Sequence, residues 1–236
     1  MSPRRLSHVL IRVADLPAAV ATYRALGFTC VWGSDPARAH NALIYFEEGP
    51  FLELFTPPAP SKARDGAISL VAGSRAAARI RRWATPGEGP IEYAVEIPDF
   101  ELGATRADLK KAGFLMSRPF RARRRRPDGI ELAWWLSMPS DLELPFLMGT
   151  YRPADDQPPE ARRHVNGARR VAALDLSHPD PTGYAARLAR YLGDDPGGQG
   201  ITIAAGETCG VAALRIEGLA QDIPPRAAHG AALVRA

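Results

Sequence analysis

The sequence predicts an α+β fold of tandem βαβββ modules followed by a third, partial module. The first observation is a strand–helix–strand–strand–strand order over residues 1–56. The second is the return of this order over residues 90–151, and the third is its partial return over residues 164–220. Repetition at this scale constrains the whole architecture, since each copy is expected to fold alike.

The first module opens with a strand at residues 8–16, in which polar and apolar side chains alternate before a turn. A helix is predicted over residues 17–26, because Asp15 is a suitable N-cap and Gly27 stands at the C-terminal end. Apolar and aromatic runs complete the module as three strands, at residues 28–32, 40–46 and 51–55. The order is therefore βαβββ.

The second module repeats the opening strand and its turn at a constant offset. Glu92 lies 84 positions after His8, and Asp99 lies 84 positions after Asp15. A helix is predicted over residues 101–112, ending at a Gly-Phe pair as the first helix does. Two later strands are predicted beyond an arginine-rich stretch, at residues 129–136 and 142–148.

Composition identifies the segments between and after the modules. Residues 57–89 contain a Pro-rich turn and a small helix, and we expect them to connect the first two modules. Residues 152–163 are predicted to be a linker, and residues 221–236 a loosely ordered tail rich in Pro and Ala. The partial module is predicted to contain a strand, a helix and two strand-like runs, at residues 171–180, 183–192, 200–204 and 211–216.

The composition is that of an ordinary globular protein, with 46% hydrophobic and 24% charged residues. No run approaches the roughly 18–20 apolar residues that cross a bilayer, and the first residues lack the apolar stretch of a secretory signal. Cys30 and Cys209 lie far apart, without histidines at metal-finger spacing, which favours a reducing compartment. We therefore expect a cytoplasmic protein with no membrane partner.

The net charge is +4, and the run at residues 121–126 contains five arginines. Such a run can indicate nucleic-acid binding, but this one lacks interleaved aromatic residues and a surrounding binding motif. We interpret it as a solvated loop or strand edge and expect no nucleic-acid partner. The sequence also lacks a phosphate loop, a dinucleotide fingerprint and a nucleophile elbow, so we expect neither a nucleotide cofactor nor serine-triad hydrolysis.

Two stretches of the first module, HVLIRVADLPAAVATYRALGF and FLELF, resemble the vicinal oxygen chelate superfamily of glyoxalases and extradiol dioxygenases. The motifs HNALIYF, LPFLM and HVNG together are similar to its glyoxalase-like subset, over about residues 5–217. The resemblance implies that paired modules form a curved mixed sheet around a cleft. It also implies one divalent metal, held by residues on the first and last strands of each module.

The resemblance assigns candidate metal ligands by position. His8 matches the first-strand ligand and Glu53 the last-strand ligand of the first module. Glu92 stands at the second module's first-strand position, where the superfamily usually has histidine. The last position falls on Phe146 or Glu143, depending on which strand residues are aligned. We favour Phe146, which has no donor atom for a metal.

Strand periodicity places His8 and Glu53 together without reference to the family. His8 and Arg12 share one face of their strand, opposite an all-apolar face that is expected to pack beneath the helix. Glu53 lies between Phe51 and Phe55 on one face of the closing strand. A carboxylate in such surroundings is costly to bury unless it has a partner. We therefore expect His8 and Glu53 to be neighbours in the cleft, as a catalytic pair, as metal ligands or as a simple hydrogen-bonded pair.

Several other residues are candidates for contacts with a ligand. Trp134 and Trp135 point to opposite faces of their strand, so that one lines the cleft, and Trp134 is the candidate. A structural role is favoured for His164 and Asn166, whose Asn-Gly sequence is typical of a turn. The remaining candidates share a face with the site or begin a strand beside it: Arg12, His40, Asn41 and Phe51. A histidine at a strand edge, such as His40, is equally often structural.

Three functions are compatible with these residues. The first is a metal-dependent lyase, isomerase or dioxygenase acting on a small oxygenated molecule, with His8, Glu53 and Glu92 around Fe, Mn, Zn or Ni. The second is metal-free binding or sequestration of a small molecule in the same cleft. The third is a fold that serves only assembly. The resemblance is also compatible with a homodimer, because many relatives pair modules between chains.

Overall fold

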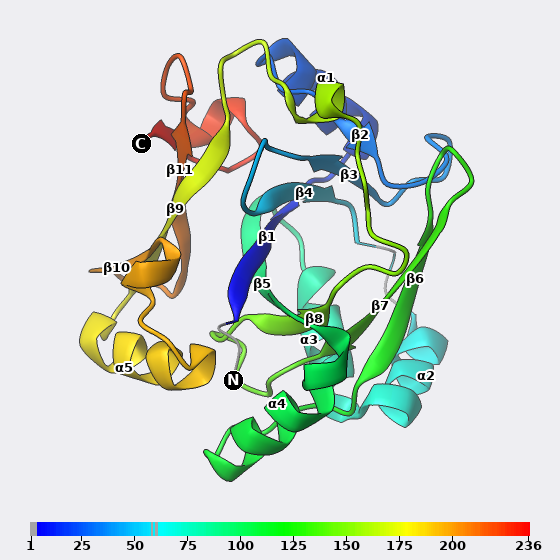
Figure 1. The fold of residues 1–236 in the computed structure, drawn as a ribbon, viewed down its shortest axis with the longest axis vertical. Coiled ribbons are helices and arrows are strands. Elements are labelled where there is room, and N and C mark those ends of the chain that lie inside the picture. Colours follow the sequence, from blue (N-terminus) through cyan, green and yellow to red (C-terminus); the bar gives the residue numbers. More distant parts are fainter. Residues whose placement is uncertain (1–3, 58, 60) are drawn as a thin grey trace.

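The computed structural model describes residues 4–57, 59 and 61–236, and its strands form two sheets in this part of the chain (Figure 1). The larger sheet has the order β2-β3-β4-β1-β5-β8-β7-β6, and the smaller one has the order β10-β9-β11-β12. The larger sheet curls into a half-barrel, and this arrangement confirms the predicted α+β fold with repeated βαβββ modules (Figure 1). Among the described residues, no helix is both long and apolar enough to span a membrane.

The first module follows the predicted order. Its elements are β1 (Arg5–Arg12), α1 (Leu16–Ala25), β2 (Val31–Trp32), β3 (Asn41–Ile44) and β4 (Phe51–Phe55). The Asp15 side chain accepts a hydrogen bond of 2.9 Å from the Ala18 amide, which confirms the predicted N-cap of α1. Strand β1 pairs with β4 in parallel, whereas β3 pairs with β4 in antiparallel orientation. This pairing places the first and last strands of the module side by side.

The second module joins the first through the antiparallel pair of β1 and β5. Its elements are β5 (Gly89–Ile97), α4 (Asp99–Lys111), β6 (Phe120–Arg125), β7 (Glu131–Ser137) and β8 (Phe146–Gly149). The arginine-rich run forms β6, the edge strand of the larger sheet, as the strand-edge interpretation expected. Alternate residues of β6 are more exposed, so the strand has a solvent face and an inner face.

The connecting segment contains two helices where one small helix was expected, α2 (Lys62–Ala72) and α3 (Ser74–Trp83). Ala76 is fully buried and belongs to the apolar cluster of Leu10, Ala94 and Phe146 on the inner face of the larger sheet. Helix α3 thus packs into the hollow of the half-barrel. Its small residues permit this close approach.

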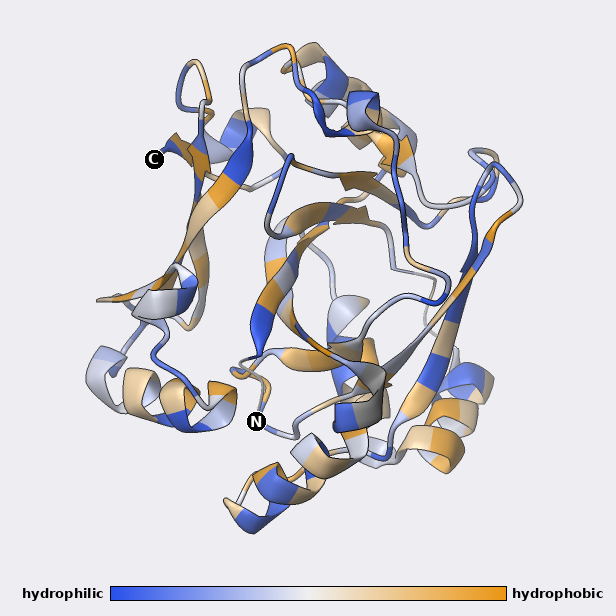
Figure 2. Cartoon of the chain, in the orientation of Figure 1, coloured by the Kyte–Doolittle hydropathy of each residue, from blue (hydrophilic) through white to orange (hydrophobic). Residues whose placement is uncertain are grey.

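The third module forms the smaller sheet with one long helix. Its strands and helix are β9 (Arg170–His178), α5 (Pro181–Leu192), β10 (Ile201–Ala205), β11 (Gly210–Glu217) and β12 (Leu233–Arg235). Figure 2 shows polar and apolar residues mixed along α5, whose buried residues include Tyr184 and Leu188. A loosely ordered tail was expected beyond residue 220, but β12 pairs with β11 there, and Leu233 is fully buried.

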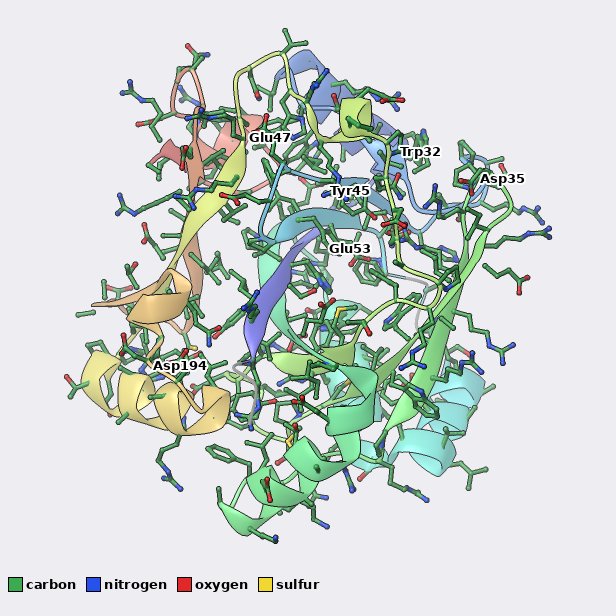
Figure 3. All side chains as sticks on the ribbon, viewed as in Figure 1. Trp32, Asp35, Tyr45, Glu47, Glu53 and Asp194 are labelled. Carbon is green, nitrogen blue, oxygen red and sulfur yellow. The ribbon has the colours of Figure 1, made fainter. Side chains whose placement is uncertain are left out.

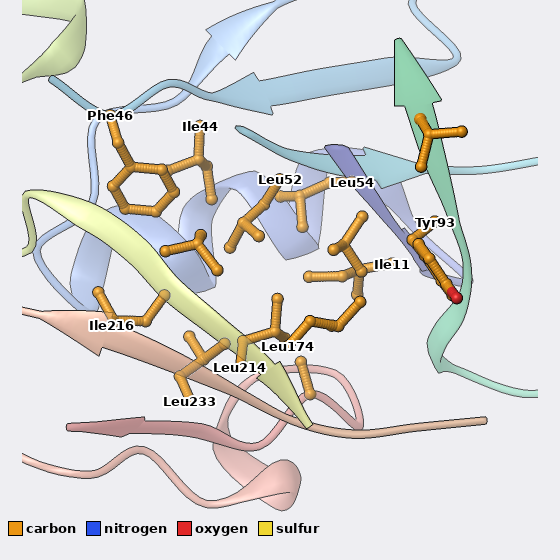
Figure 4. Close-up of a cluster of buried hydrophobic side chains, with 14 of the residues drawn as sticks. Ile11, Ile44, Phe46, Leu52, Leu54, Tyr93, Leu174, Leu214, Ile216 and Leu233 are labelled. Atoms are coloured by element: carbon orange, nitrogen blue, oxygen red, sulfur yellow. The ribbon is translucent and has the colours of Figure 1, made fainter. Parts of the chain in front are cut away.

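The main core lies between the two sheets. Figure 4 shows Ile11, Leu52 and Leu54 of the larger sheet facing Leu174 and Leu214 of the smaller one. These residues occupy the outer face of the half-barrel, because the side chains of successive strand residues alternate between faces. The inner face is therefore left for the residues His8, Arg12, Phe51, Glu53 and Glu92.

Candidate functional site

His8 and Glu53 meet on the inner face of the half-barrel, on the paired strands β1 and β4. His8 Nε2 lies 3.4 Å from Glu53 Oε2, and their side chains are 5% and 15% exposed. The predicted proximity of the two residues is confirmed. Figure 3 shows Glu53 on β4, beside the hollow of the sheet and below Tyr45. The His8 ring stacks on Phe51 at a centroid distance of 4.7 Å and meets the edge of Phe146 at 5.7 Å.

Hydrogen bonds hold the His8 ring and the Glu53 carboxyl group from either side. The Ser7 hydroxyl donates to Met148 Sδ at 3.2 Å, and its oxygen lies 3.1 Å from His8 Nδ1. With the proton on Nδ1, His8 donates to the Ser7 oxygen and the lone pair of Nε2 faces Glu53; with the proton on Nε2, His8 donates to the Glu53 carboxylate. On the other side, Asn41 Nδ2 donates to Glu53 Oε1 at 2.8 Å. Asn41 thus stands beside the site, where the sequence placed it.

Burial shifts both groups toward their uncharged forms. It lowers the pKa of His8 to about 3, and the positive charge of Arg124 adds to this effect. It also raises the pKa of Glu53, although the Asn41 hydrogen bond and the charge of Arg124 oppose the rise. His8 is consequently a neutral base at physiological pH, facing a carboxyl group that holds its proton more readily than usual. Such a pair can accept a proton from a bound molecule or donate one to it.

Glu92 is engaged by other partners. Its carboxylate forms a buried ion pair with Arg79 Nη1 and accepts a hydrogen bond from the indole of Trp83, both on α3. Arg79 also donates to the carbonyl oxygens of Asp141 and Leu144, at 2.7 and 2.9 Å. Burial raises the pKa of Glu92, and the Arg79 guanidinium opposes that rise. The connecting helix thus supplies the counter-charge of the residue that was predicted as a third metal ligand.

The strand register identifies the fourth position of the superfamily's ligand set. Leu10 pairs with Glu53 between β1 and β4, and its counterpart Ala94 pairs with Phe146 between β5 and β8. Phe146 is therefore the equivalent of Glu53, as favoured from the sequence over Glu143. The set thus comprises His8, Glu53, an arginine-bound glutamate and a phenylalanine. These residues do not fit the superfamily's four-ligand metal centre, because two of the four positions offer no free donor.

In the described part of the chain, one group of three potential ligands has its donor atoms within 4.8 Å of one another: Glu143, His178 and Cys209. Glu143 and Cys209 line a pocket together with Tyr93 of β5 and Tyr184 of α5, where the smaller sheet meets the larger one. His178 Nδ1 accepts from the Asp180 amide at 2.8 Å, so the proton is on Nε2, which lies 3.4 Å from Glu143. Arg187 also binds the Glu143 carboxylate. The imidazole lone pair and the carboxylate are thus already used in a network that joins α5 to the second module.

The remaining predicted ligand contacts divide between the site and its surroundings. Phe51 stacks on His8, and Trp134 is half-buried against Tyr151 at a centroid distance of 4.9 Å. Arg12 instead binds the loop after α3, through Gly87 O and through Thr85 Oγ1 at 2.9 Å. His40 is exposed at the start of β3. Trp135 is 40% exposed, which confirms that the two tryptophans face opposite sides.

His164 and Asn166 hold the turn that was predicted for them. The Thr29 amide donates to His164 Nδ1 at 3.0 Å, and His164 Nε2 donates to Tyr45 O at 2.8 Å. Asn166 donates to Leu26 O and accepts from the Ala168 amide. Both side chains are therefore structural, and they fasten the third module to the first.

Sequence reasoning missed the residues that border the site from β6 and from the segment after β8. Arg124 lies on the inner face of β6, and its guanidinium stands 5.5 Å from the centroid of the Tyr151 ring. Asp155, from the segment predicted as a linker, forms an ion pair with Arg124 at 2.7 Å. A cavity of about 390 Å³ borders this group; Tyr45, Phe51, Tyr151, Asp155 and Ser7 are among its lining residues. Burial alternates along residues 120–125. Because the strand period is two, a strand prediction for this run could have placed Arg124 on the inner face.

Comparison with solved structures finds several proteins with a similar fold. The fold is similar to a hypothetical protein from Staphylococcus aureus, with a TM-score of 0.66 and 12% identity over 97% of each chain. It also resembles the Mn(II)-bound glyoxalase from Novosphingobium aromaticivorans, with a TM-score of 0.51 and 12% identity over 91% of this chain and 65% of that one. The 2,3-dioxygenase LapB from Pseudomonas sp. KL28 has a TM-score of 0.52 and 12% identity, over 92% and 76%. At such identities the likeness establishes the fold.

The glyoxalase-like domain family matches residues 6–192, and the chain belongs to this family. A comparison with curated proteins finds no match.

Proposed function

We propose that this protein binds a small oxygenated molecule at His8, Glu53 and Asn41 in the half-barrel, and that it does so without a resident divalent metal. The observation that carries the proposal is the state of Glu92, whose carboxylate is held by Arg79. Phe146 at the fourth ligand position supports the same conclusion. The family's fold is retained, while two of its metal-ligand positions are used for packing and charge neutralisation.

The site has the donors and acceptors that an oxygenated molecule requires. The lone pair of His8 Nε2 can accept a hydrogen bond from a hydroxyl group, and a protonated Glu53 can donate one to a carbonyl oxygen. The stacked ring of Phe51 keeps the imidazole in place, and Phe146 provides an apolar wall. Because the site is largely desolvated, hydrogen bonds to a bound molecule are strengthened there.

A metal-dependent lyase, isomerase or dioxygenase is the second candidate. It is favoured by the convergence of the His8 lone pair and the Glu53 carboxylate on one point, since imidazole and carboxylate suit Fe, Mn, Zn and Ni. This candidate requires Glu92 to exchange Arg79 for the metal.

The test combines metal analysis with ligand binding. Wild-type protein is purified without a histidine tag, and its metal content is measured after incubation with each ion. We expect no stoichiometric metal, and we expect calorimetric binding of catechol, whose vicinal oxygens match the site, in the metal-free protein. Resorcinol, with its oxygens separated, serves as the ligand control.

Two histidine variants locate the binding. The substitution His8→Ala is expected to abolish catechol binding, whereas His40→Ala, which alters an exposed histidine of the same module, is expected to preserve it. Stoichiometric metal that is lost in His8→Ala would overturn the metal-free proposal and establish the second candidate. Catechol binding that persists in His8→Ala would refute the assigned site.

A further inference from the structure

The segment of residues 150–157, called here the strap, leaves β8 and reaches the inner side of β6 before the chain rises toward the 3₁₀ turn Pro159–Arg162 (Figure 1). Its attachment is a buried carboxylate, Asp155, whose side chain is 5% exposed. A buried carboxylate is costly unless charged or polar donors surround it. The donors that hold Asp155 therefore define an anion site.

Four donors converge on the two oxygens of Asp155. Oδ2 accepts from Tyr45 Oη at 2.5 Å and from Arg124 Nη2 at 2.7 Å. Oδ1 accepts from Arg126 Nη1 at 3.1 Å and from Gln157 Nε2 at 2.7 Å. Tyr45 and both arginines lie outside the strap. Strand β6 and the residues directly after β6 and β3 thus supply a preformed carboxylate site. The strap supplies the carboxylate.

Arg124 connects this anion site with the His8–Glu53 pair. Its side chain is 7% exposed, and its Nε is buried without a hydrogen-bond partner. Tyr45, which binds Asp155 together with Arg124, contacts the Phe51 ring at a centroid distance of 5.2 Å, and Phe51 stacks on His8. The Arg124 charge also contributes to the lowered pKa of His8 and opposes the raised pKa of Glu53. A buried guanidinium with an unused donor is equipped to bind a further oxygen atom.

We propose that Arg124, Arg126 and Tyr45 form a carboxylate subsite of the ligand cleft, which Asp155 occupies until a ligand carboxylate displaces it. The inference rests on the proposed function and narrows the ligand to small oxygenated acids. A ligand of this class places its carboxylate on Arg124 and its hydroxyl or carbonyl oxygen toward His8 and Glu53.

Exchange of one carboxylate for another preserves the bonds that stabilise the arginines. The ligand gives Arg124 and Tyr45 the same charge-assisted hydrogen bonds that Asp155 gives them now. The cavity of about 390 Å³ that Asp155 and Tyr151 line leaves space beside the strap. Asp155 competes as part of the same chain, with an effective concentration in the millimolar range for short flexible segments. Removing this competitor is therefore expected to raise the affinity for a free carboxylate.

The experiment measures calorimetric binding of benzoate, with benzamide as its uncharged counterpart. The substitution Asp155→Asn is expected to raise the benzoate affinity by about tenfold or more, because it removes the internal competitor. Benzamide affinity is expected to remain unchanged. The control is Asp128→Asn, which removes an equal charge from Arg126 at 2.6 Å in an exposed position, and it is expected to leave the benzoate affinity at the wild-type value. Adding Arg124→Gln to Asp155→Asn is expected to abolish the gain.

Hydrogen exchange of the wild-type protein provides a second test that needs no variant. Saturating benzoate is expected to speed exchange of the amides of residues 151–157, because their anchor is released, and benzamide is expected not to. The subsite would be refuted if Asp155→Asn and Asp128→Asn changed the benzoate affinity equally. It would also be refuted if bound benzoate left the hydrogen exchange of residues 151–157 unchanged. If catechol binding still required His8 in that case, the proposed function would stand. Catechol binding that does not depend on His8, with the benzoate response intact, would instead refute the proposed function and leave the subsite in place.

Discussion

The substitution Arg79→Met leaves the Glu92 carboxylate buried without its guanidinium partner. Arg79 is fully buried and Glu92 is 8% exposed, so water does not replace the lost charge. Removing one partner of a buried ion pair costs about 3–5 kcal/mol. Arg79 also donates to the carbonyl oxygens of Asp141 and Leu144, and such hydrogen bonds contribute about 1 kcal/mol each. These contributions sum to about 5–7 kcal/mol, and because the hydrogen bond from Trp83 to Glu92 remains, we expect a net loss near the lower end, about 5 kcal/mol.

The double substitution Arg79→Met/Glu92→Met is expected to be more stable than Arg79→Met alone, because no charge is then buried without a partner. The coupling between the two positions should reach about 2–3 kcal/mol. Urea unfolding, followed by tryptophan fluorescence, measures these differences. Arg81→Met is the matched control on the same helix, since Arg81 is 56% exposed and lies 3.8 Å from Asp65. Its expected cost is below about 0.5 kcal/mol. A cost for Arg79→Met below about 1 kcal/mol, or strictly additive effects, would refute the reasoning.

Two further predictions concern the pH dependence of stability and the packing of the chain's end. Burial lowers the folded pKa of His8 from 6.5 to about 3, so the unfolded chain binds the proton first as the pH falls below 6.5. His8 thus lowers the free energy of unfolding by about 2 kcal/mol between pH 7 and pH 5. The substitution His8→Phe should remove this decrease from free energies measured by urea unfolding. Identical pH slopes for the two proteins would contradict this prediction. Gly230→Ala should cost about 2 kcal/mol or more, because Gly230 has φ of 83° and an added Cβ would lie 2.8 Å from Gly89 Cα. Gly103→Ala, in open space on α4, should instead stabilise by about 0.5–1 kcal/mol, and equal signs in thermal unfolding would refute the packing argument.

Local pattern was sufficient to predict the modules and the central pair of the site. The alternation around His8 and the position of Glu53 between Phe51 and Phe55 determine which side chains face inward, because the strand period is two. The constant offset between His8 and Glu92 predicted the second module in the same way. Such predictions succeed because a strand's faces are encoded within a few residues.

The neutralisation of the inner charges could not be predicted in this way. Arg79 and Asp155 lie in segments that were assigned to a connection and a linker, and neither has a local pattern that points to a sheet. Their partners, Glu92 and Arg124, stand 13 and 31 positions away along the chain. The pairing depends on how α3 and the strap pack into the hollow, which is a tertiary property. Composition alone therefore indicated solvent-exposed segments at positions where the structure has buried ion pairs.

The contrast among Glu53, Glu92 and Asp155, three carboxylates with largely buried side chains, supports the proposed site. Glu92 is paired with Arg79, and Asp155 is paired with Arg124. Within the described part of the chain, Glu53 has a neutral amide and the neutral His8 imidazole as its polar partners. A carboxylate kept in a desolvated position without a cation destabilises the folded state, and its pKa rises accordingly. Stability alone favours an apolar residue at this position, as Phe146 demonstrates at the equivalent position of the second module. The retained cost at Glu53 is thus best explained by a ligand that supplies the missing partner.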